Sequence, residues 1–143
     1  MNIKIKRFDT SIPLPERKTM GAAAFDFAAR EAVTIAPKSI GYVPLNVAME
    51  IPADHFLLIA ARSGTHKRGL MAANGIGIID SDFCGDGDEI KAVYYNFTDA
   101  PVLVEKGERI AQGTFVPITK LGWTEADHLE NKDRGAFGTT GRH

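Results

Sequence analysis

The chain has 143 residues, long enough to bury a hydrophobic core as one domain without disulfides. Its 17 basic and 18 acidic side chains leave a formal net charge of −1, which argues against a protein that grips nucleic acid through a basic excess. The single cysteine, Cys84, excludes an intrachain disulfide and suits a reducing compartment. No stretch resembles a signal peptide or approaches membrane-spanning length, so we expect a soluble cytoplasmic protein.

Short strand patterns follow one another along most of the chain. Residues 2–8 alternate polar and apolar side chains, as a half-buried strand does, before two prolines interrupt the pattern. Further strands are expected where apolar, β-branched and aromatic residues gather, at 23–30, 32–37, 40–51, 55–61, 76–79, 89–97 and 109–118. Only residues 63–70 have room for a helical turn. This arrangement predicts an all-β sandwich, jelly roll or barrel.

The strand pattern fades towards the end of the chain. We expect residues 1–143 to form a single domain in which residues 119–143 are a C-terminal extension. The extension ends in a glycine-rich arm, DRGAFGTTGRH at 133–143, which carries a cation, an aromatic ring and two hydroxyls. A tail of this kind either packs on a neighbouring subunit or frays, and for its last ten residues fraying is expected when no ligand is bound.

The segment ARSGTHKRGL places Arg62, Ser63 and Gly64 directly after an apolar strand. A guanidinium fork, a hydroxyl and a closely approachable backbone N–H suit an oxyanion, and a following helical turn favours a phosphate at its start. The alternative is that Ser63 caps a short helix while Arg62 is solvated. For the triplet taken alone, that alternative is favoured.

The segment NGIGIIDSDFCG, residues 74–85, interrupts an apolar strand with glycines. Glycine normally weakens strand pairing, so Gly75 and Gly77 indicate a site where a ligand or another backbone comes close. Asp80 follows two isoleucines, and a carboxylate at the end of a buried strand can act as a general base. The alternative is a turn residue with local hydrogen bonds.

Two more polar residues lie inside apolar runs. Gln112, in KGERIAQGTF, must find a hydrogen-bond partner, either a structural group or a positioned water, and Asp26 stands between two phenylalanines. Taken singly, each is interpreted as structural. The four histidines lack the spacing of a metal site, and neither a Walker loop nor a nucleophile elbow is present.

Taken in order, five segments resemble the motifs of the trimeric deoxyuridine triphosphatase (dUTPase) family: AAAFDFAA, ARSGTHKRGL, NGIGIIDSDFCG, KGERIAQ and RGAFGTTG. They run from residue 22 to residue 141. The resemblance implies a jelly-roll-like dUTPase fold (β-clip) and a homotrimer whose active sites lie at subunit interfaces and are closed by a flexible arm. It also implies Mg²⁺-dependent hydrolysis of dUTP to dUMP and pyrophosphate. That reaction keeps uracil out of DNA and supplies dUMP for dTMP synthesis.

The resemblance also implies a role for each matching residue. Asp80 matches the aspartate that activates the attacking water, Gln112 the glutamine that holds this water, and Asp26 a supporting aspartate. The implied phosphate contacts are Arg62, Ser63, Gly64, Arg134, Gly138 and Thr139. The implied uracil and deoxyribose contacts are Asn74, Ile78, Ile79, Asp80, Phe83, Lys91 and Phe137. No direct protein ligand to Mg²⁺ is expected, because the triphosphate and water would hold the ion.

The chain departs from the family pattern in several places. Phe83 stands where tyrosine is usual, Cys84 where arginine is common, and GDGDE at 85–89 forms an acidic insertion near the site.

Two alternative functions remain. A dCTP deaminase shares the fold but would need a glutamate at the base, and a non-catalytic trimeric β module would bind a nucleotide or a protein partner.

Overall fold

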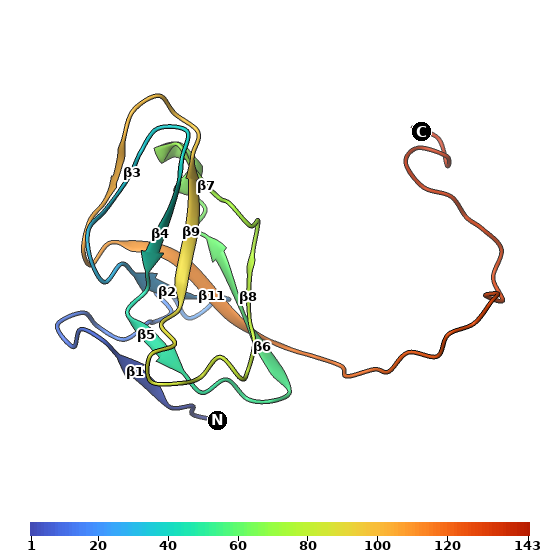
Figure 1. The fold of residues 1–143 in the computed structure, drawn as a ribbon, viewed down its shortest axis with the longest axis horizontal. Helices are drawn as coiled ribbons and strands as arrows, with labels where there is room; N and C mark the ends of the chain where they lie inside the picture. Colours follow the sequence, from blue (N-terminus) through green and yellow to red (C-terminus); the bar gives the residue numbers. More distant parts are fainter.

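The computed structural model describes residues 1–143 and contains eleven short strands and one turn of 3₁₀ helix (Figure 1). The strands are β1 (Ile5–Arg7), β2 (Phe25–Ala28), β3 (Val33–Ile35), β4 (Ile40–Pro44), β5 (Val47–Met49), β6 (His55–Ala61), β7 (Leu70–Ala72), β8 (Gly77–Ile79), β9 (Lys91–Asn96), β10 (Val102–Val104) and β11 (Arg109–Pro117). The helical turn, η1, spans Thr65–Arg68. The predicted all-β class and the helical turn within residues 63–70 are confirmed.

All strand pairs are antiparallel. The larger sheet has the order β2-β11-β6-β8, the smaller has the order β4-β9-β7, and β1-β5 and β10-β3 form two-stranded pairs. Neighbours in these sheets are mostly distant in sequence, as in a jelly roll rather than a meander. This topology brings segments from the whole chain onto one sheet.

One hydrophobic cluster fills the space between the two larger sheets. It contains 17 buried residues, most of them on or beside β2, β6 and β11 on one side and β4, β7 and β9 on the other, and β3, β5 and β10 contribute Ile35, Val47, Met49 and Val104. Because side chains alternate along a strand, the inner faces of both sheets supply this core. Every buried side-chain nitrogen and oxygen has a hydrogen-bond partner.

Two expected elements differ from the structure, and two strands were not expected. Residues 40–51 are two strands, because the chain turns at the buried Asn46, whose φ of 72° is a left-handed conformation that asparagine tolerates. The expected buried strand at 76–79 is the shorter β8, and it is half exposed, with Ile78 59% exposed. β7 and β10, each only three residues long, have no counterpart among the expected strands.

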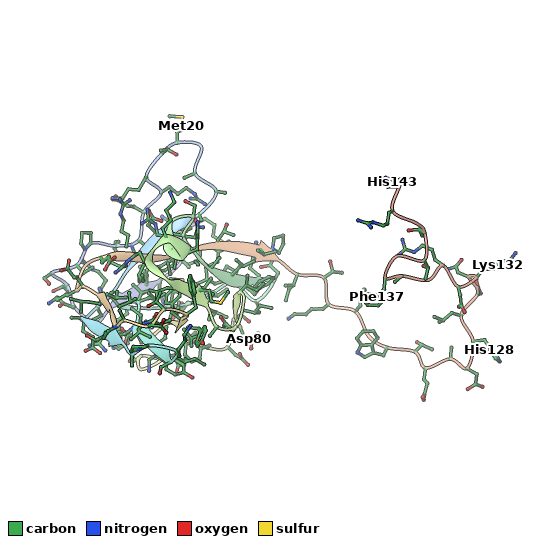
Figure 2. The ribbon with its side chains drawn as sticks, turned by 90° about the horizontal axis from the view of Figure 1, so that it is seen from above. Met20, Asp80, His128, Lys132, Phe137 and His143 are labelled. Carbon is green, nitrogen blue, oxygen red and sulfur yellow. The ribbon has the colours of Figure 1, made fainter.

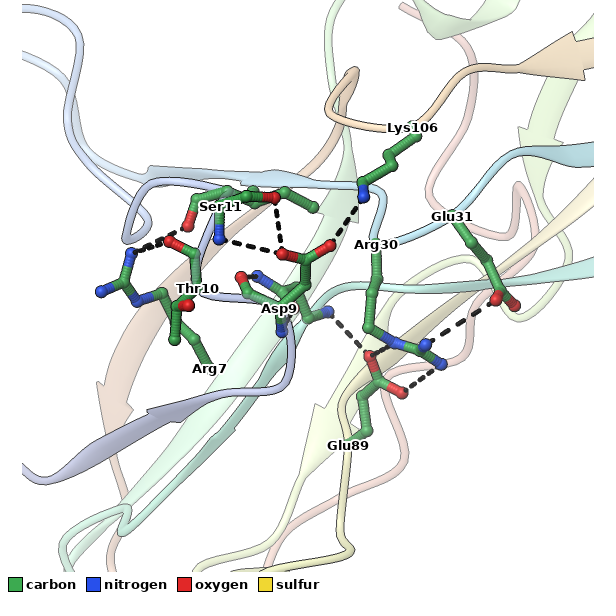
Figure 3. A network of polar contacts seen from close by, with 10 residues as sticks. Arg7, Asp9, Thr10, Ser11, Arg30, Glu31, Glu89 and Lys106 are labelled. Carbon is green, nitrogen blue, oxygen red and sulfur yellow. Dashed lines mark hydrogen bonds and ion pairs between the residues drawn. The ribbon is translucent and has the colours of Figure 1, made fainter.

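A polar network ties the acidic insertion to the body of the protein (Figure 3). The Glu89 side chain is 8% exposed and accepts from Arg30 Nε at 2.7 Å and Arg30 Nη2 at 3.1 Å. The same carboxylate accepts the backbone N–H of Asn46 at 3.0 Å. Glu89 therefore fixes the turn between β4 and β5 as well as the end of the insertion.

Asp9 forms the second centre of this network. Its carboxylate accepts from Lys106 Nζ at 2.7 Å and from the backbone N–H of Ser11 at 2.9 Å. The Lys106 hydrogen bond is the main reason that the pKa of Asp9 is held well below its usual range, with the bonds from Ser11 contributing. The ion pair between Asp9 and Lys106 therefore links the start of the chain to the turn before β11.

Beyond β11 the chain contains no strand or helix, and every residue from 117 to 143 is exposed. This segment runs away from the sheets and ends far from them (Figures 1 and 2). No helix in the structure has the length and apolar character needed to cross a membrane.

Candidate active site

Polar residues gather on one face of the larger sheet. Gln112 on β11 pairs with Asp26 on β2 and with Ala60 on β6. The register shifts between Arg109 and Ala111, so that Arg109 pairs with Ala28. Since residues two apart on a strand share a face, this bulge brings Arg109 to the face of Asp26 and Gln112.

The side chains on this face contact one another directly. Asp26 Oδ1 accepts from Arg62 Nε at 3.2 Å, and Asp26 Oδ2 accepts from Arg109 Nη1 at 3.0 Å. Arg62 Nη1 donates to the backbone carbonyl of Arg109 at 3.2 Å, and Gln112 Nε2 donates to that of Ala61 at 3.0 Å. We call Asp26, Arg62, Arg109 and Gln112 the arginine cluster.

The turn after β6 adds hydrogen-bond donors beside this cluster. Gly64 is the N-cap of η1, and no side chain caps the helix, so the alternative in which Ser63 acts as the cap is wrong. The backbone N–H groups of Ser63 and Gly64 have no acceptor within the protein, and both residues are exposed. Together with Arg62, they form a group of donors suited to phosphate oxygens.

The hairpin between β7 and β8 is shaped by glycine. Gly75 has a φ of 73° and its N–H donates to the Ala72 carbonyl at 3.1 Å, which closes a tight turn. A Cβ at Gly77 would lie 3.3 Å from the Ile59 Cβ, tighter than most real contacts of this kind. Glycine therefore lets β8 pair closely with β6.

This hairpin borders a small cavity of about 20 Å³, enough for about one water molecule. Its lining includes Asn74, Gly77, Lys91 and Tyr94 but no carboxylate. The Asn74 side chain is exposed and has no hydrogen-bond partner in the protein. Burial raises the pKa of Tyr94 to about 12, and its hydroxyl donates to the Ile110 carbonyl. Asn74 thus offers a free amide at the mouth of an apolar hollow.

Asp80 lies just beyond the end of β8, in the loop to the acidic insertion (Figure 2). It is exposed and lines a cavity of about 350 Å³ together with Phe56, Ile78 and Lys120. The Phe83 N–H donates to the Asp80 carbonyl at 3.1 Å, and the Phe83 ring is 39% exposed. Asp80 follows β8 as expected, but the expectation that this strand is buried is wrong, because Ile78 is 59% exposed and Asp80 itself is exposed.

Asp80 and Arg62 lie far apart on the same sheet. Ile79 pairs with Leu57, which places Asp80 opposite Phe56, whereas Arg62 follows the other end of β6. At about 3.3 Å per strand residue, the separation between Asp80 and Arg62 is about 20 Å. One chain therefore presents two separate half-sites.

The predicted arm residues belong to neither half-site. Arg134, Phe137, Gly138 and Thr139 all lie in the exposed extension, and Phe137 is labelled in Figure 2 well away from Asp80. Phe137 is fully exposed and has a φ of 53° between glycines of positive φ. Their contacts to phosphates and to uracil stay predictions.

On this antiparallel β fold, the arginine cluster presents partly exposed guanidinium groups, which are donors suited to a small anion. The dUTPase family model matches residues 10–141. The deoxyuridine 5'-triphosphate nucleotidohydrolase of Hydrogenobaculum sp. is 38% identical over 145 residues, 99% of each chain. The dUTPase of Streptococcus mutans has a similar structure, with a TM-score of 0.76 and 31% identity over 83% of this chain and 98% of that one. This chain belongs to the dUTPase family of nucleotide hydrolases.

A phage enzyme extends the structural likeness to nearly the whole chain. The dUTPase of Staphylococcus bacteriophage 80alpha, a G164S mutant with dUpNHpp, has a TM-score of 0.85 and covers 98% of each chain. Its sequence identity is 23%, so this likeness concerns the fold. It confirms the dUTPase fold that the motifs imply.

Proposed function

We propose that this protein hydrolyses dUTP to dUMP and pyrophosphate by direct attack of water on the α-phosphorus. The observation that carries the proposal is the arginine cluster, in which Arg62 lies beside Gln112 and the free N–H groups of Ser63 and Gly64. Such donors bind phosphate oxygens and stabilise the charge that develops on them during attack.

Asp80 and Gln112 would act on the attacking water. Gln112 Nε2 is held by the Ala61 carbonyl, which leaves the amide oxygen to orient the water. The Asp80 carboxylate accepts a proton from the water while the water oxygen bonds to the α-phosphorus. The bond between the α-phosphorus and the oxygen that bridges it to the β-phosphate breaks. Pyrophosphate leaves with those electrons.

Recognition of the base and sugar is assigned to the β7-β8 hairpin. β8 is an edge strand, so one side of its backbone at Ile78 and Ile79 has no partner strand and can bond to a uracil edge. The free Asn74 amide adds a donor and an acceptor. Lys91 borders the same cavity, and the exposed rings of Phe83 and Phe137 supply surfaces for deoxyribose and uracil, respectively.

Mg²⁺ fits this site as a companion of the substrate. No group of three or more His, Cys, Asp or Glu residues can hold a metal ion, and both oxygens of Asp26 already accept from arginines. Mg²⁺ keeps several waters and binds substrate phosphates readily. When bound, it would offset triphosphate charge and orient the α-phosphorus, while Arg62 and Arg134 bind the remaining oxygens.

A homotrimer would join the two half-sites. Because about 20 Å separates Asp80 from Arg62 along β6, a site containing both needs a second chain. Closed symmetric assembly provides equivalent sites at each interface. The arm at residues 133–143 would reach such a site from a neighbour, with Gly138 and Thr139 around the phosphates.

An exposed apolar face supports this assembly. On the outer side of the smaller sheet, Tyr95 lies between its strand partners Ile40 and Met71, and Val93 pairs with Tyr42. Ile40, Tyr42 and Met71 are 58%, 66% and 52% exposed. An antiparallel sheet face that meets water normally carries polar side chains. We assign this face to contact between subunits.

The alternatives have less support. A deaminase of the same fold needs a glutamate at the base, and no glutamate lines the cavity beside Asn74. A non-catalytic binding module would have no need for Asp80 and Gln112 together.

The single exposed thiol, Cys84, suits a reducing cytoplasm.

The test is pyrophosphate release in the presence of Mg²⁺ from dUTP, dCTP, dTTP and UTP, with a chelator as the metal control. Release from dUTP alone, lost on chelation, supports the reaction and its selectivity for base and sugar. Ammonia from dCTP indicates a deaminase. No product from any nucleotide contradicts the proposed activity.

A further inference from the structure

Asp26 holds the arginine cluster together. Its side chain is 15% exposed, and each of its carboxylate oxygens accepts from a different guanidinium, one from Arg62 and one from Arg109. Arg62 Nη1 in turn donates to the Arg109 backbone carbonyl. These three contacts close a ring that fixes the Arg62 guanidinium at Nε and at Nη1.

One edge of Arg62 remains free. Its Nη2 atom has no acceptor in the protein, and the side chain is 36% exposed. The unpaired N–H groups of Ser63 and Gly64 follow directly in the chain. A guanidinium already held at two nitrogens loses less conformational freedom on binding an anion, so its free edge is preorganised for a phosphate.

We propose that Asp26 is a positioning residue that acts through Arg62. In this ring, Arg62 and Arg109 together form a clamp for the substrate's phosphates. This inference rests on the proposed function, which assigns Arg62 to phosphate binding. It separates Asp26 from the uracil and deoxyribose contacts, which lie on the hairpin and beyond β8.

Charge and positioning predict opposite results when Asp26 is changed. Two arginines and one aspartate leave the ring with a charge of +1, and Asp26→Asn raises this to +2. If charge alone mattered, a triphosphate would bind the variant more tightly. If Asp26 positions Arg62, the triphosphate binds more weakly despite the added charge.

Glu16 supplies a matched control. It lines the same cavity of about 250 Å³ as Asp26 and Arg109, and its carboxylate pairs with Lys18 and makes no contact with Arg62. The Glu16 backbone carbonyl accepts the Asp26 N–H at 3.0 Å, but its side chain makes none of the ring's hydrogen bonds. Glu16→Gln therefore removes the same charge nearby while the ring's hydrogen bonds stay in place. Arg109→Lys keeps the positive charge but loses the planar fork.

The experiment measures Kd for dUpNHpp by calorimetry, and for deoxyuridine by NMR titration, in the wild type and the three variants. We expect Asp26→Asn to weaken dUpNHpp binding about tenfold, which corresponds to the loss of one charge-assisted hydrogen bond. We expect Arg109→Lys to weaken it several-fold. The Kd for deoxyuridine should stay within about twofold of wild type in every variant. For Glu16→Gln, the Kd for dUpNHpp should also stay within about twofold of wild type.

Unchanged or tighter dUpNHpp binding by Asp26→Asn overturns the inference. So does an equal loss for dUpNHpp and deoxyuridine, which indicates a purely structural role. Arg62→Gln distinguishes a failure of the phosphate assignment from a failure of the positioning role. If this variant binds dUpNHpp normally, the phosphate assignment in the proposed function fails. If Arg62→Gln is impaired and Asp26→Asn is not, only the positioning role fails.

Discussion

Asp80 and Arg62 lie at opposite ends of β6, about 20 Å apart along the larger sheet. Each lies within a set of polar groups suited to part of the proposed reaction. Arg62 belongs to the arginine cluster, and Asp80 lies beside the hairpin assigned to uracil. Because no single chain brings them together, the proposed reaction requires that neighbouring subunits share each site.

Asp80→Asn should abolish turnover while leaving dUTP binding largely intact. The amide keeps the size and hydrogen-bonding capacity of the side chain but cannot accept the proton from water. We expect kcat to fall about 10²- to 10⁴-fold, with the Kd for dUpNHpp within a few-fold of wild type. Asp82→Asn, which changes a neighbouring carboxylate on the same cavity, is the control. Undiminished kcat in the Asp80 variant would refute the base assignment.

Tyr42→Glu should break the assembly. The Tyr42 ring is 66% exposed on the apolar face of the smaller sheet, where a buried unpaired carboxylate would be costly. Sedimentation should show dissociation towards monomers, together with loss of activity. Thr34→Glu, which introduces the same carboxylate at an exposed position on β3, should leave assembly intact. A fully assembled Tyr42 variant would mean that the interface lies elsewhere.

Glu89→Gln should destabilise the fold. The change removes a nearly buried carboxylate that accepts from Arg30 and from the Asn46 backbone, so we expect a loss of about 1.5–3 kcal/mol in unfolding free energy. Glu31→Gln, which breaks an exposed 3.7 Å pair with Arg30, should cost less than about 1 kcal/mol. Urea titrations at one protein concentration compare the two, and equal losses would argue against the network in Figure 3.

Asp9 should make stability depend on acid pH. Its pKa lies below the ordinary value of 3.8 because Lys106 donates to it. The ionised carboxylate therefore stabilises the fold above that value, and the contribution is lost as pH falls towards the lowered pKa. The difference in unfolding free energy between wild type and Asp9→Asn should be constant from about pH 7 to pH 5 and shrink below about pH 4. An equal difference at pH 7 and pH 3 would contradict this.

Much of the fold was predictable from local patterns. Apolar runs bounded by Gly and Pro located most strands, and the helical turn after Arg62 was expected. The turn at Asn46 was missed because its cause is distant: hydrogen bonds to Asp9, 37 residues earlier in the chain. β7 and β10 were too short to show a period.

Arg109 was the main omission from the candidate site. It lies three residues before Gln112, and an odd spacing on a regular strand places side chains on opposite faces. The bulge between Arg109 and Ala111 reverses this relationship. The separation of Asp80 from Arg62 was equally invisible, because it depends on the antiparallel pairing of β8 with the middle of β6, which directs Asp80 towards the start of β6.

The most direct test of the shared site is subunit mixing between two inactive variants, Asp80→Asn and Arg62→Gln. If each site takes Asp80 from one chain and Arg62 from another, mixed trimers contain sites with both native residues. An equal mixture, unfolded and refolded together, should regain about a quarter of wild-type activity, since random assembly gives this fraction of intact sites. Each variant refolded alone should stay inactive. No recovery from verified mixed trimers would contradict a site shared between chains.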